Sequence, residues 1–257
     1  MNGPLCEIEP LESGIVRLWL NRPDRCNAFS TALLDELIAT LEKLETDNSL
    51  RVVILRGRGK IFCGGLDLYQ ASTSDELARE MPEKVAHILS SIYESRLVFI
   101  ASVHGAACAG GAALTTVCDL SVAVRSFKIA LPEVRRGLSP ALLLPLMRRK
   151  VAEGHLRQLM LTGMPVTAER AQAMGIITHV VDDLPELDDA ALAMAQTVLE
   201  GCPASVAAAK KLIAESYPRP LADELADSLE EHLRSWHSPE AQEGIAAFLE
   251  KRQPRWD

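Results

Sequence analysis

The segment from Leu97 to Cys118 contains no Asp, Glu, Lys or Arg, so most of it must leave water when the chain folds. Its length would suffice for a membrane-spanning helix. Its composition argues against one, because Ala, Gly, Ser and Thr contribute little transfer free energy and His104 lies inside it. We therefore expect a buried strand, a glycine turn and a buried helix, and no membrane association.

The segments on either side alternate between two kinds of pattern. Ile15–Leu20 and Val52–Leu55 are short apolar runs typical of buried strands. Between them, Ser30 can cap a helix that runs to about Glu45, with leucines at helical spacing. Further strands are predicted at 99–103 and 120–124, a further helix at 76–95, and after residue 140 mainly helices, at 168–174, 188–199, 205–216, 221–234 and 241–251, with an extended piece at 176–181. This alternation predicts an α/β fold with a largely parallel sheet.

Composition excludes several classes of protein. The chain has 257 residues, of which 48% are hydrophobic and 24% charged, as in an ordinary globular protein. Its net charge of −8 provides no general attraction for nucleic acid. The six cysteines are scattered without a CxxC pair, and no HExxH motif occurs, so we expect reduced cysteines and no metal site. The N-terminus has neither a basic start nor an apolar run, so we expect a cytoplasmic protein.

Two glycine pairs follow predicted strands. Gly64-Gly65 lies within Ile61–Leu68, and Gly110-Gly111 lies within Val103–Leu114, where it opens a helix. Glycine lets a ligand approach the main chain closely, and free amides at a helix start suit an oxygen that becomes negative. Either pair alone would be typical of a simple tight turn, and neither matches a dinucleotide or P-loop motif. Together they predict an oxyanion hole.

Five segments, in this order, carry a resemblance to a known family: 20–29 (LNRPDRCNAF), 62–68 (FCGGLDL), 110–111 (GG), 118–119 (CD) and 243–252 (EGIAAFLEKR). They resemble successive signatures of the enoyl-CoA hydratase/isomerase (crotonase) superfamily. The resemblance implies a spiral of ββα units at 1–195 and a helical C-terminal trimerisation region at 196–257, in a homotrimer or hexamer. It implies no cofactor besides coenzyme A or phosphopantetheine as the acyl carrier.

The resemblance also implies a site. The amides of Leu66 and Gly110 would form the oxyanion hole around a thioester carbonyl. Residues of the two turns and of later segments would contact the substrate: Gly64, Gly65, Asp67, Leu68, Gly111, Ala113, Ala141, Arg25 and Asn27. Of these, Arg25 and Asn27 would lie near the pantetheine or nucleotide end. Asp67 is expected to orient the first turn by local hydrogen bonds.

Hydratases of this family typically use two glutamates, and this chain has only one of them. At the position of the first glutamate it has Ala113, which cannot transfer a proton. The second matches Glu133 in Leu131-Pro132-Glu133 and is left as the sole general acid/base. A proline followed by a glutamate is also typical of a first helical turn, but the resemblance favours catalysis. We expect partial burial to raise the pKa of Glu133.

The stretch after Glu133 narrows the resemblance. Leu138-Ser139-Pro140-Ala141 is similar to the Leu-x-Pro-Ala form of enzymes that handle 3-methylglutaconyl and 3-hydroxy-3-methylglutaryl thioesters. The segments 108–111 (CAGG) and 144–149 (LPLMRR) resemble dehydratases of polyketide β-branching, which convert 3-hydroxy-3-methylglutaryl-ACP to 3-methylglutaconyl-ACP. The lysine of the companion decarboxylases is absent from 67–70 (DLYQ).

Several alternatives stay open at this point. One carboxylate also fits a Δ3,Δ2-enoyl-CoA isomerase, and the family includes hydratases of enoyl-CoA and 3-methylglutaconyl-CoA. A catalytically silent crotonase that acts as a binding protein is a third reading. Arg135 and Arg136 could bind a distal carboxylate or form a pair that faces solvent or another subunit of an oligomer. We expect His104 to lie in the core, and His232 and His237 to be exposed near the C-terminal helices.

Overall fold

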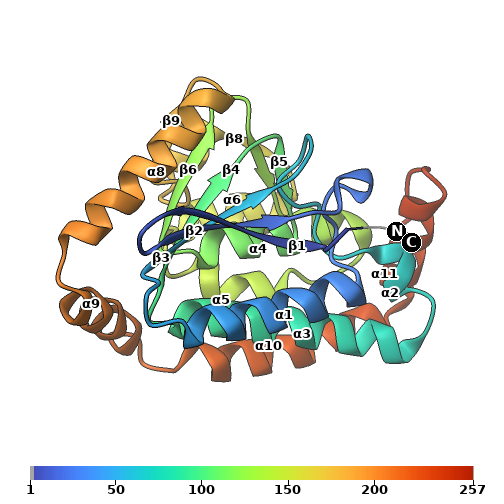
Figure 1. Ribbon diagram of the computed structural model, residues 1–257. Coiled ribbons are helices and arrows are strands. Elements are labelled where there is room, and N and C mark those ends of the chain that lie inside the picture. Colours follow the sequence, from blue (N-terminus) through green and yellow to red (C-terminus); the bar gives the residue numbers. More distant parts are fainter. Residues whose placement is uncertain (1–2, 257) are drawn as a thin grey trace.

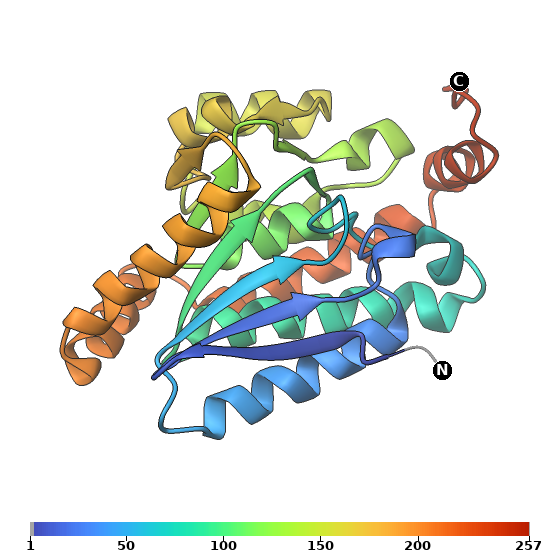
Figure 2. The same cartoon turned by 45° about the horizontal axis from the view of Figure 1, so that its top comes forward.

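A six-stranded sheet organises the computed structural model, which describes residues 3–256 (Figure 1). Its strands lie in the order β1 (Cys6–Glu12), β2 (Ile15–Leu20), β3 (Val52–Gly57), β4 (Val98–Val103), β6 (Leu120–Val124) and β9 (His179–Val181), fanned side by side in Figure 2. Within this sheet, only the β1–β2 pair is antiparallel. A smaller sheet joins β5 (Ala106–Cys108), β7 (Lys128–Ala130) and β8 (Val166–Thr167). The predicted α/β class with a mainly parallel sheet is confirmed.

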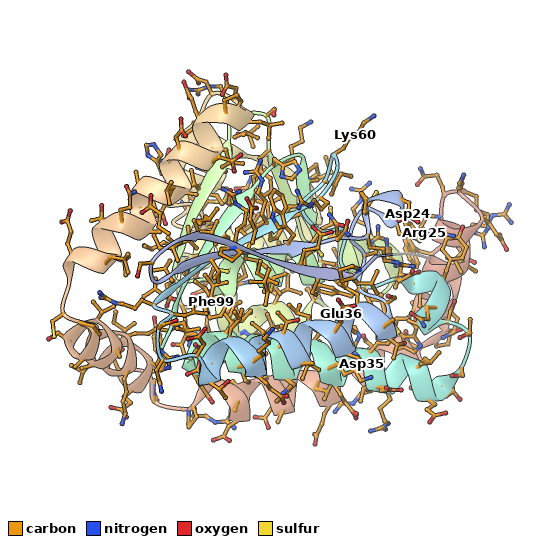
Figure 3. The ribbon with its side chains drawn as sticks, viewed as in Figure 1. Asp24, Arg25, Asp35, Glu36, Lys60 and Phe99 are labelled. Carbon is orange, nitrogen blue, oxygen red and sulfur yellow. The ribbon has the colours of Figure 1, made fainter. Side chains whose placement is uncertain are left out.

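Helices cover the large sheet. In Figure 1, α1 (Thr31–Thr46), α3 (Asp75–Glu94) and α10 (Leu221–Trp236) form a layer along one side. Away from that layer, α8 (Leu184–Glu200) packs on β3, β4 and β6. Figure 3 shows Phe99, from β4, in the interior. The remaining helical pieces are η1 (Pro23–Arg25), α2 (Leu68–Ala71), α4 (Gly110–Val117), η2 (Pro132–Arg136), η3 (Ala141–Leu143), α5 (Leu144–Met147), α6 (Glu153–Thr162), α7 (Ala168–Ala173), α9 (Pro203–Glu215) and α11 (Pro239–Leu249).

The uncharged segment at 97–118 folds as its composition predicts. Every residue of β4 is buried, and so are the residues of α4 from Gly111 to Val117. The glycine turn lies between them, next to β5. Within residues 3–256, no helix combines the length and the apolar character needed to cross a membrane.

Local signals account for the predicted elements that are confirmed. Ser30 caps α1 by accepting a hydrogen bond from the amide of Leu33 at 3.2 Å. The carboxylate of Glu36, one turn into α1, accepts hydrogen bonds from the amides of Leu5 and Cys6 at 3.0 and 2.9 Å. These contacts fix the start of β1 on the helix layer.

Several elements were not predicted, β1 and α6 among them, and one was shorter than predicted. β1 has one buried residue and contains Pro10, so it lacks the apolar run of a buried strand. α6 buries only Leu156 and Leu159, which is too weak a pattern for recognition. Of the extended piece predicted at 176–181, only β9 is a strand. The predicted division at residue 195 falls inside α8 and stays a prediction, as does the trimer.

Candidate active site

The two glycine-bearing turns touch each other. The amide of Cys108 donates to the carbonyl of Cys63 at 3.1 Å and thereby joins the second turn to the first. Gly65 has φ +89°, and a Cβ there would lie 2.6 Å from the carbonyl oxygen of Cys108 and 3.2 Å from the amide nitrogen of Gly110. Only glycine tolerates both this backbone angle and this approach. The contact therefore depends on Gly65 lacking a side chain.

Two backbone amides are left free at this contact. Gly110 begins α4, so its amide has no carbonyl one turn earlier within the helix. The amide of Leu66 donates to no described residue, because the neighbouring bonds run from Phe29 N to Gly65 O at 2.8 Å and from Asp67 N to Phe29 O at 3.0 Å. Leu66 and Gly110 line the same pocket. Two free amides on adjacent turns can stabilise an oxygen that acquires negative charge.

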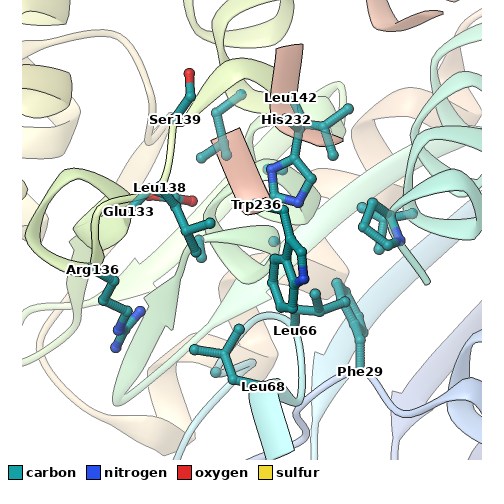
Figure 4. A pocket seen from close by; sticks show the side chains of 17 residues that line it. Phe29, Leu66, Leu68, Glu133, Arg136, Leu138, Ser139, Leu142, His232 and Trp236 are labelled. Carbon is teal, nitrogen blue, oxygen red and sulfur yellow. The ribbon is translucent and has the colours of Figure 1, made fainter. Parts of the chain in front are cut away.

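A buried carboxylate faces the same pocket. Glu133 lies in η2 with 6% of its surface exposed, and its Oε2 has no hydrogen-bond partner among the described residues. Figure 4 shows its side chain directed into the pocket. Burial raises the pKa of Glu133 to about 7, while a backbone hydrogen bond of its own residue and the nearby Arg136 act in the opposite direction. The expected upward shift is thus present, and it suits a residue that exchanges protons near neutral pH.

The pocket is otherwise largely apolar (Figure 4). Its apolar side chains come from distant parts of the chain: Phe29, Leu66, Leu68, Pro82, Val85, Leu138, Leu142, Leu143 and Trp236. The polar side chains that line it are Glu133, Arg136, Ser139 and His232. Exclusion of water by such a lining strengthens every electrostatic interaction inside the pocket.

The two adjacent arginines lie in different surroundings. Arg135 is exposed, and its guanidinium donates to Met164 Sδ at 3.1 Å. Arg136 lines the pocket, with its guanidinium carbon 4.2 Å from the centre of the Phe248 ring of α11. It forms no ion pair with the described residues. Burial lowers the pKa of Arg136, although an arginine with a lowered pKa still carries its charge at neutral pH.

Six of the predicted site residues line the pocket: Gly64, Leu66, Leu68, Gly110, Ala113 and Glu133. Gly65 is not a lining residue and lies where the two turns touch. Asp67 caps α2 and pairs with Arg22 at 2.7 Å, as expected for a residue that orients the first turn. Gly111 is a packing position, since a Cβ there would lie 2.2 Å from the carbonyl oxygen of Cys63. Ala141 is buried in η3, next to Leu142 of the pocket wall.

The two residues expected near the carrier lie outside the pocket. Arg25 is exposed beside Asp24 on the loop at η1 (Figure 3). Asn27 is completely buried and therefore has no surface with which to contact a carrier. Its side-chain amide donates to the carbonyls of Arg58, Ile61 and Phe62 at 2.9, 2.8 and 3.1 Å. Asn27 thus holds the loop that leads to the first glycine turn.

His232 is a correction to the sequence-based prediction. It was expected to be exposed, but it is 8% exposed and lines the pocket from α10. The signal was its spacing from Trp236, because residues four apart share one face of a helix. His237 is exposed as predicted. His104 is a core residue as predicted, with Nε2 at 2.9 Å from the carbonyl oxygen of Gly59.

The model of one protein family, described as enoyl-CoA hydratase/isomerase, matches residues 11–257. The chain belongs to this family. The 2,3-dehydroadipyl-CoA hydratase of Escherichia coli K12 is 30% identical over 241 residues, which cover 93% of this chain and 94% of the relative. A crystal structure of an enoyl-CoA hydratase from Mycobacterium avium is 33% identical, with a TM-score of 0.88 and full coverage of both chains. An enoyl-CoA hydratase from Mycobacterium smegmatis is 34% identical, with a TM-score of 0.78 and 99% of both chains covered.

Family membership confirms the predicted superfamily, its crotonase-like fold and an enzyme of the lyase class. Enoyl-CoA hydratase family enzymes need no separate cofactor, because coenzyme A is attached to the substrate. Among residues 3–256, no group of three or more His, Cys, Asp or Glu side chains is arranged to hold a metal ion.

Proposed function

We propose that this chain is a hydro-lyase that acts on an acyl thioester, with Leu66 and Gly110 as the oxyanion hole and Glu133 as the general acid/base. One observation carries the proposal. Two free amides on touching turns and one buried carboxylate line the same largely apolar pocket. A base and two oxyanion donors are the groups required to form and stabilise an enolate.

The reaction follows from these groups. The ionised Glu133 removes the C2 proton of a 3-hydroxyacyl thioester, and the electron pair moves onto the thioester oxygen. The two amides stabilise that oxyanion by roughly 3 kcal/mol each. As the enolate collapses, the C3–O bond breaks and protonated Glu133 gives its proton to the departing hydroxyl, so water leaves and the carboxylate is regenerated. One carboxylate serves both steps if the proton and the hydroxyl leave from the same face.

The position of a second carboxylate is filled by a methyl group. Ala113 is 1% exposed and lines the pocket at the start of α4. It can neither activate water nor protonate a leaving group. Elimination and proton transfer by a single carboxylate are therefore favoured over the two-glutamate form of hydration.

For the acyl group we propose 3-hydroxy-3-methylglutaryl, carried on an acyl carrier protein and converted to 3-methylglutaconyl. Arg136 supports an acyl chain with a second carboxylate, because it is a cation at the wall of an apolar pocket and has no ion-pair partner among the described residues. The Escherichia coli relative is named for 2,3-dehydroadipyl-CoA, whose acyl group also ends in a carboxylate.

A panel of thioesters tests this function. The protein is given 3-hydroxy-3-methylglutaryl-CoA, the same acyl group on a carrier protein, and a 3-enoyl-CoA, and the products are identified by mass spectrometry and chromatography. We expect loss of water from the hydroxymethylglutaryl thioesters, with the carrier-protein form preferred. A shift of the double bond in the 3-enoyl-CoA alone would establish the isomerase instead. Binding without turnover of any thioester would establish a silent crotonase.

In the same assay, we expect Arg136→Met to lower kcat/KM for the hydroxymethylglutaryl thioester about 10- to 100-fold, the value of one charge-assisted hydrogen bond. With 3-hydroxybutyryl-CoA, which lacks the distal carboxylate, kcat/KM should change little. Arg135→Met is the matched control, since Arg135 is exposed and outside the pocket. Equal losses on both substrates would contradict recognition of a carboxylate by Arg136.

The pKa of Glu133 predicts the pH dependence of dehydration. Glu133 must be ionised to accept the C2 proton, and burial raises its pKa to about 7. We expect kcat/KM to rise with pH, to level off above about pH 7, and to fall about tenfold for each unit below that value. Initial rates from pH 5 to pH 9 check this. A rate that stays flat down to about pH 5 would show that Glu133 keeps an ordinary carboxyl pKa in the free enzyme.

A further inference from the structure

His232 lines the pocket and carries a buried nitrogen atom without a hydrogen-bond partner among the described residues. More than nine-tenths of the residue is buried, and its Nε2 has no hydrogen-bond partner among the described residues. Figure 4 shows the imidazole inside the pocket, on the opposite side from Glu133. A buried polar atom without a partner destabilises the fold, so a ligand that supplies one gains that interaction. An unpartnered Nε2 on a side chain that lines the pocket points to a polar contact with substrate.

Hydrogen bonds hold α10 in a defined position relative to Glu133. The amide of Leu138 donates to the carbonyl of Glu133 at 3.0 Å. The amide of Ser139 donates to Ser235 Oγ at 3.0 Å, and that hydroxyl donates to the carbonyl of His232 at 3.0 Å. The chain segment that carries Glu133 is thereby linked to the helix turn that carries His232. The two side chains are pre-positioned to act on one substrate from two sides.

The charge of His232 decides which substrate atom it suits. Burial lowers the pKa of His232, and a backbone hydrogen bond with Ser139 acts in the opposite direction, so the imidazole is neutral at neutral pH. A carboxylate would be better satisfied by Arg136, which keeps its charge. A hydroxyl both donates and accepts, so it can pair with either tautomer of a neutral imidazole.

We propose that His232 Nε2 hydrogen-bonds the C3 hydroxyl of the bound 3-hydroxyacyl thioester, across the pocket from Glu133. The inference rests on the proposed function, because it requires a thioester in this pocket. His232 would then be a substrate-binding residue that fixes the C3–O bond for departure, in addition to the oxyanion hole and the general acid/base.

Binding can be measured without turnover in a Glu133→Gln background. Calorimetry compares 3-hydroxy-3-methylglutaryl-CoA with 3-methylglutaryl-CoA, which lacks only the hydroxyl. We expect the hydroxylated thioester to bind about tenfold more tightly, the value of one net hydrogen bond. Adding His232→Leu should abolish this preference and leave the affinity for 3-methylglutaryl-CoA within about twofold. His232→Gln, which retains an N–H donor, should keep part of the preference, and the exposed His237→Leu should keep all of it.

Each outcome decides the inference. A preference for the hydroxyl that survives His232→Leu overturns it. Loss of binding of both thioesters in both His232→Leu and His232→Gln also overturns it, because that result is expected of a residue that serves only for packing. Failure of the Glu133→Gln protein to bind either thioester overturns the inference together with the proposed function. If the preference depends on His232 but the wild-type protein does not dehydrate the substrate, the inference stands and the proposed reaction fails.

Discussion

Replacement of Glu133 by glutamine is expected to lower kcat for dehydration about 10³-fold, with KM within a few fold of wild type. The amide has the size and shape of the carboxylate but cannot accept the C2 proton. Glu133 is the one carboxylate among the described residues that line the pocket, and Ala113, which also lines it, carries no acid group that could replace it. Steady-state rates on the substrate that the thioester panel selects measure the effect.

The stability of this variant, measured as a function of pH, distinguishes loss of the carboxylate from loss of the fold. The pKa of Glu133 is about 7 in the folded chain against an ordinary value of 4.5, so ionisation opposes folding as the pH rises through about 7. We therefore expect the melting temperature of Glu133→Gln to equal or exceed that of the wild type at about pH 8. Glu200→Gln, at an exposed position, should change neither property. Activity within a few fold of wild type would remove Glu133 from the mechanism.

Gly65→Ala is expected to lower kcat about 10²- to 10³-fold, the effect of losing an oxyanion donor. The new Cβ would lie 2.6 Å from the carbonyl oxygen of Cys108, at a residue whose φ is +89°. Relief of this clash must move one turn away from the other, and an error of about 1 Å in the position of a catalytic group is costly. Rates should be measured together with circular dichroism, so that misplaced amides are distinguished from unfolding.

Gly154→Ala provides the comparison for this variant. Gly154 lies in α6, and a Cβ there would meet nothing within 4 Å. Its activity should equal that of the wild type, with a small gain in stability from the better helix former. If Gly65→Ala folds and retains full activity, contact between the two turns is not needed for catalysis, and the proposed oxyanion hole loses its structural basis.

The glycine turns and Glu133 could be recognised from the sequence because their signals are local. A glycine pair after an apolar run predicts both the turn and the free amides, and the residues next to Glu133 carry the resemblance. His232 could not be placed in the same way. Its burial depends on α10 packing beside a loop about a hundred residues earlier in the chain, through Ser139 and Ser235.

Arg135 and Arg136 illustrate the same limit on a smaller scale. Both follow Glu133 in η2, and the sequence leaves open which of them faces substrate. The turn of this short helix exposes the first and directs the second to the pocket, where α11 supplies Phe248 beneath its guanidinium. The burial of Asn27 could not be read from the sequence for a related reason, since it depends on hydrogen bonds to the loop at 58–62.

The groups that we propose to bind the thioester oxygen belong to the main chain. Substrate specificity and the chemistry at that oxygen therefore depend on different positions and can change separately in evolution. An exchange of the side chain at Leu66 for another non-proline residue leaves its N–H in place, so the acyl-binding wall can be remodelled while the oxygen-binding groups persist. The constraint falls instead on Gly65 and Gly111, where a single added methyl group would meet a carbonyl oxygen. New substrates are therefore accessible through changes in the pocket wall, whereas the proposed enolate chemistry depends on Gly65 and Gly111, which tolerate no side chain.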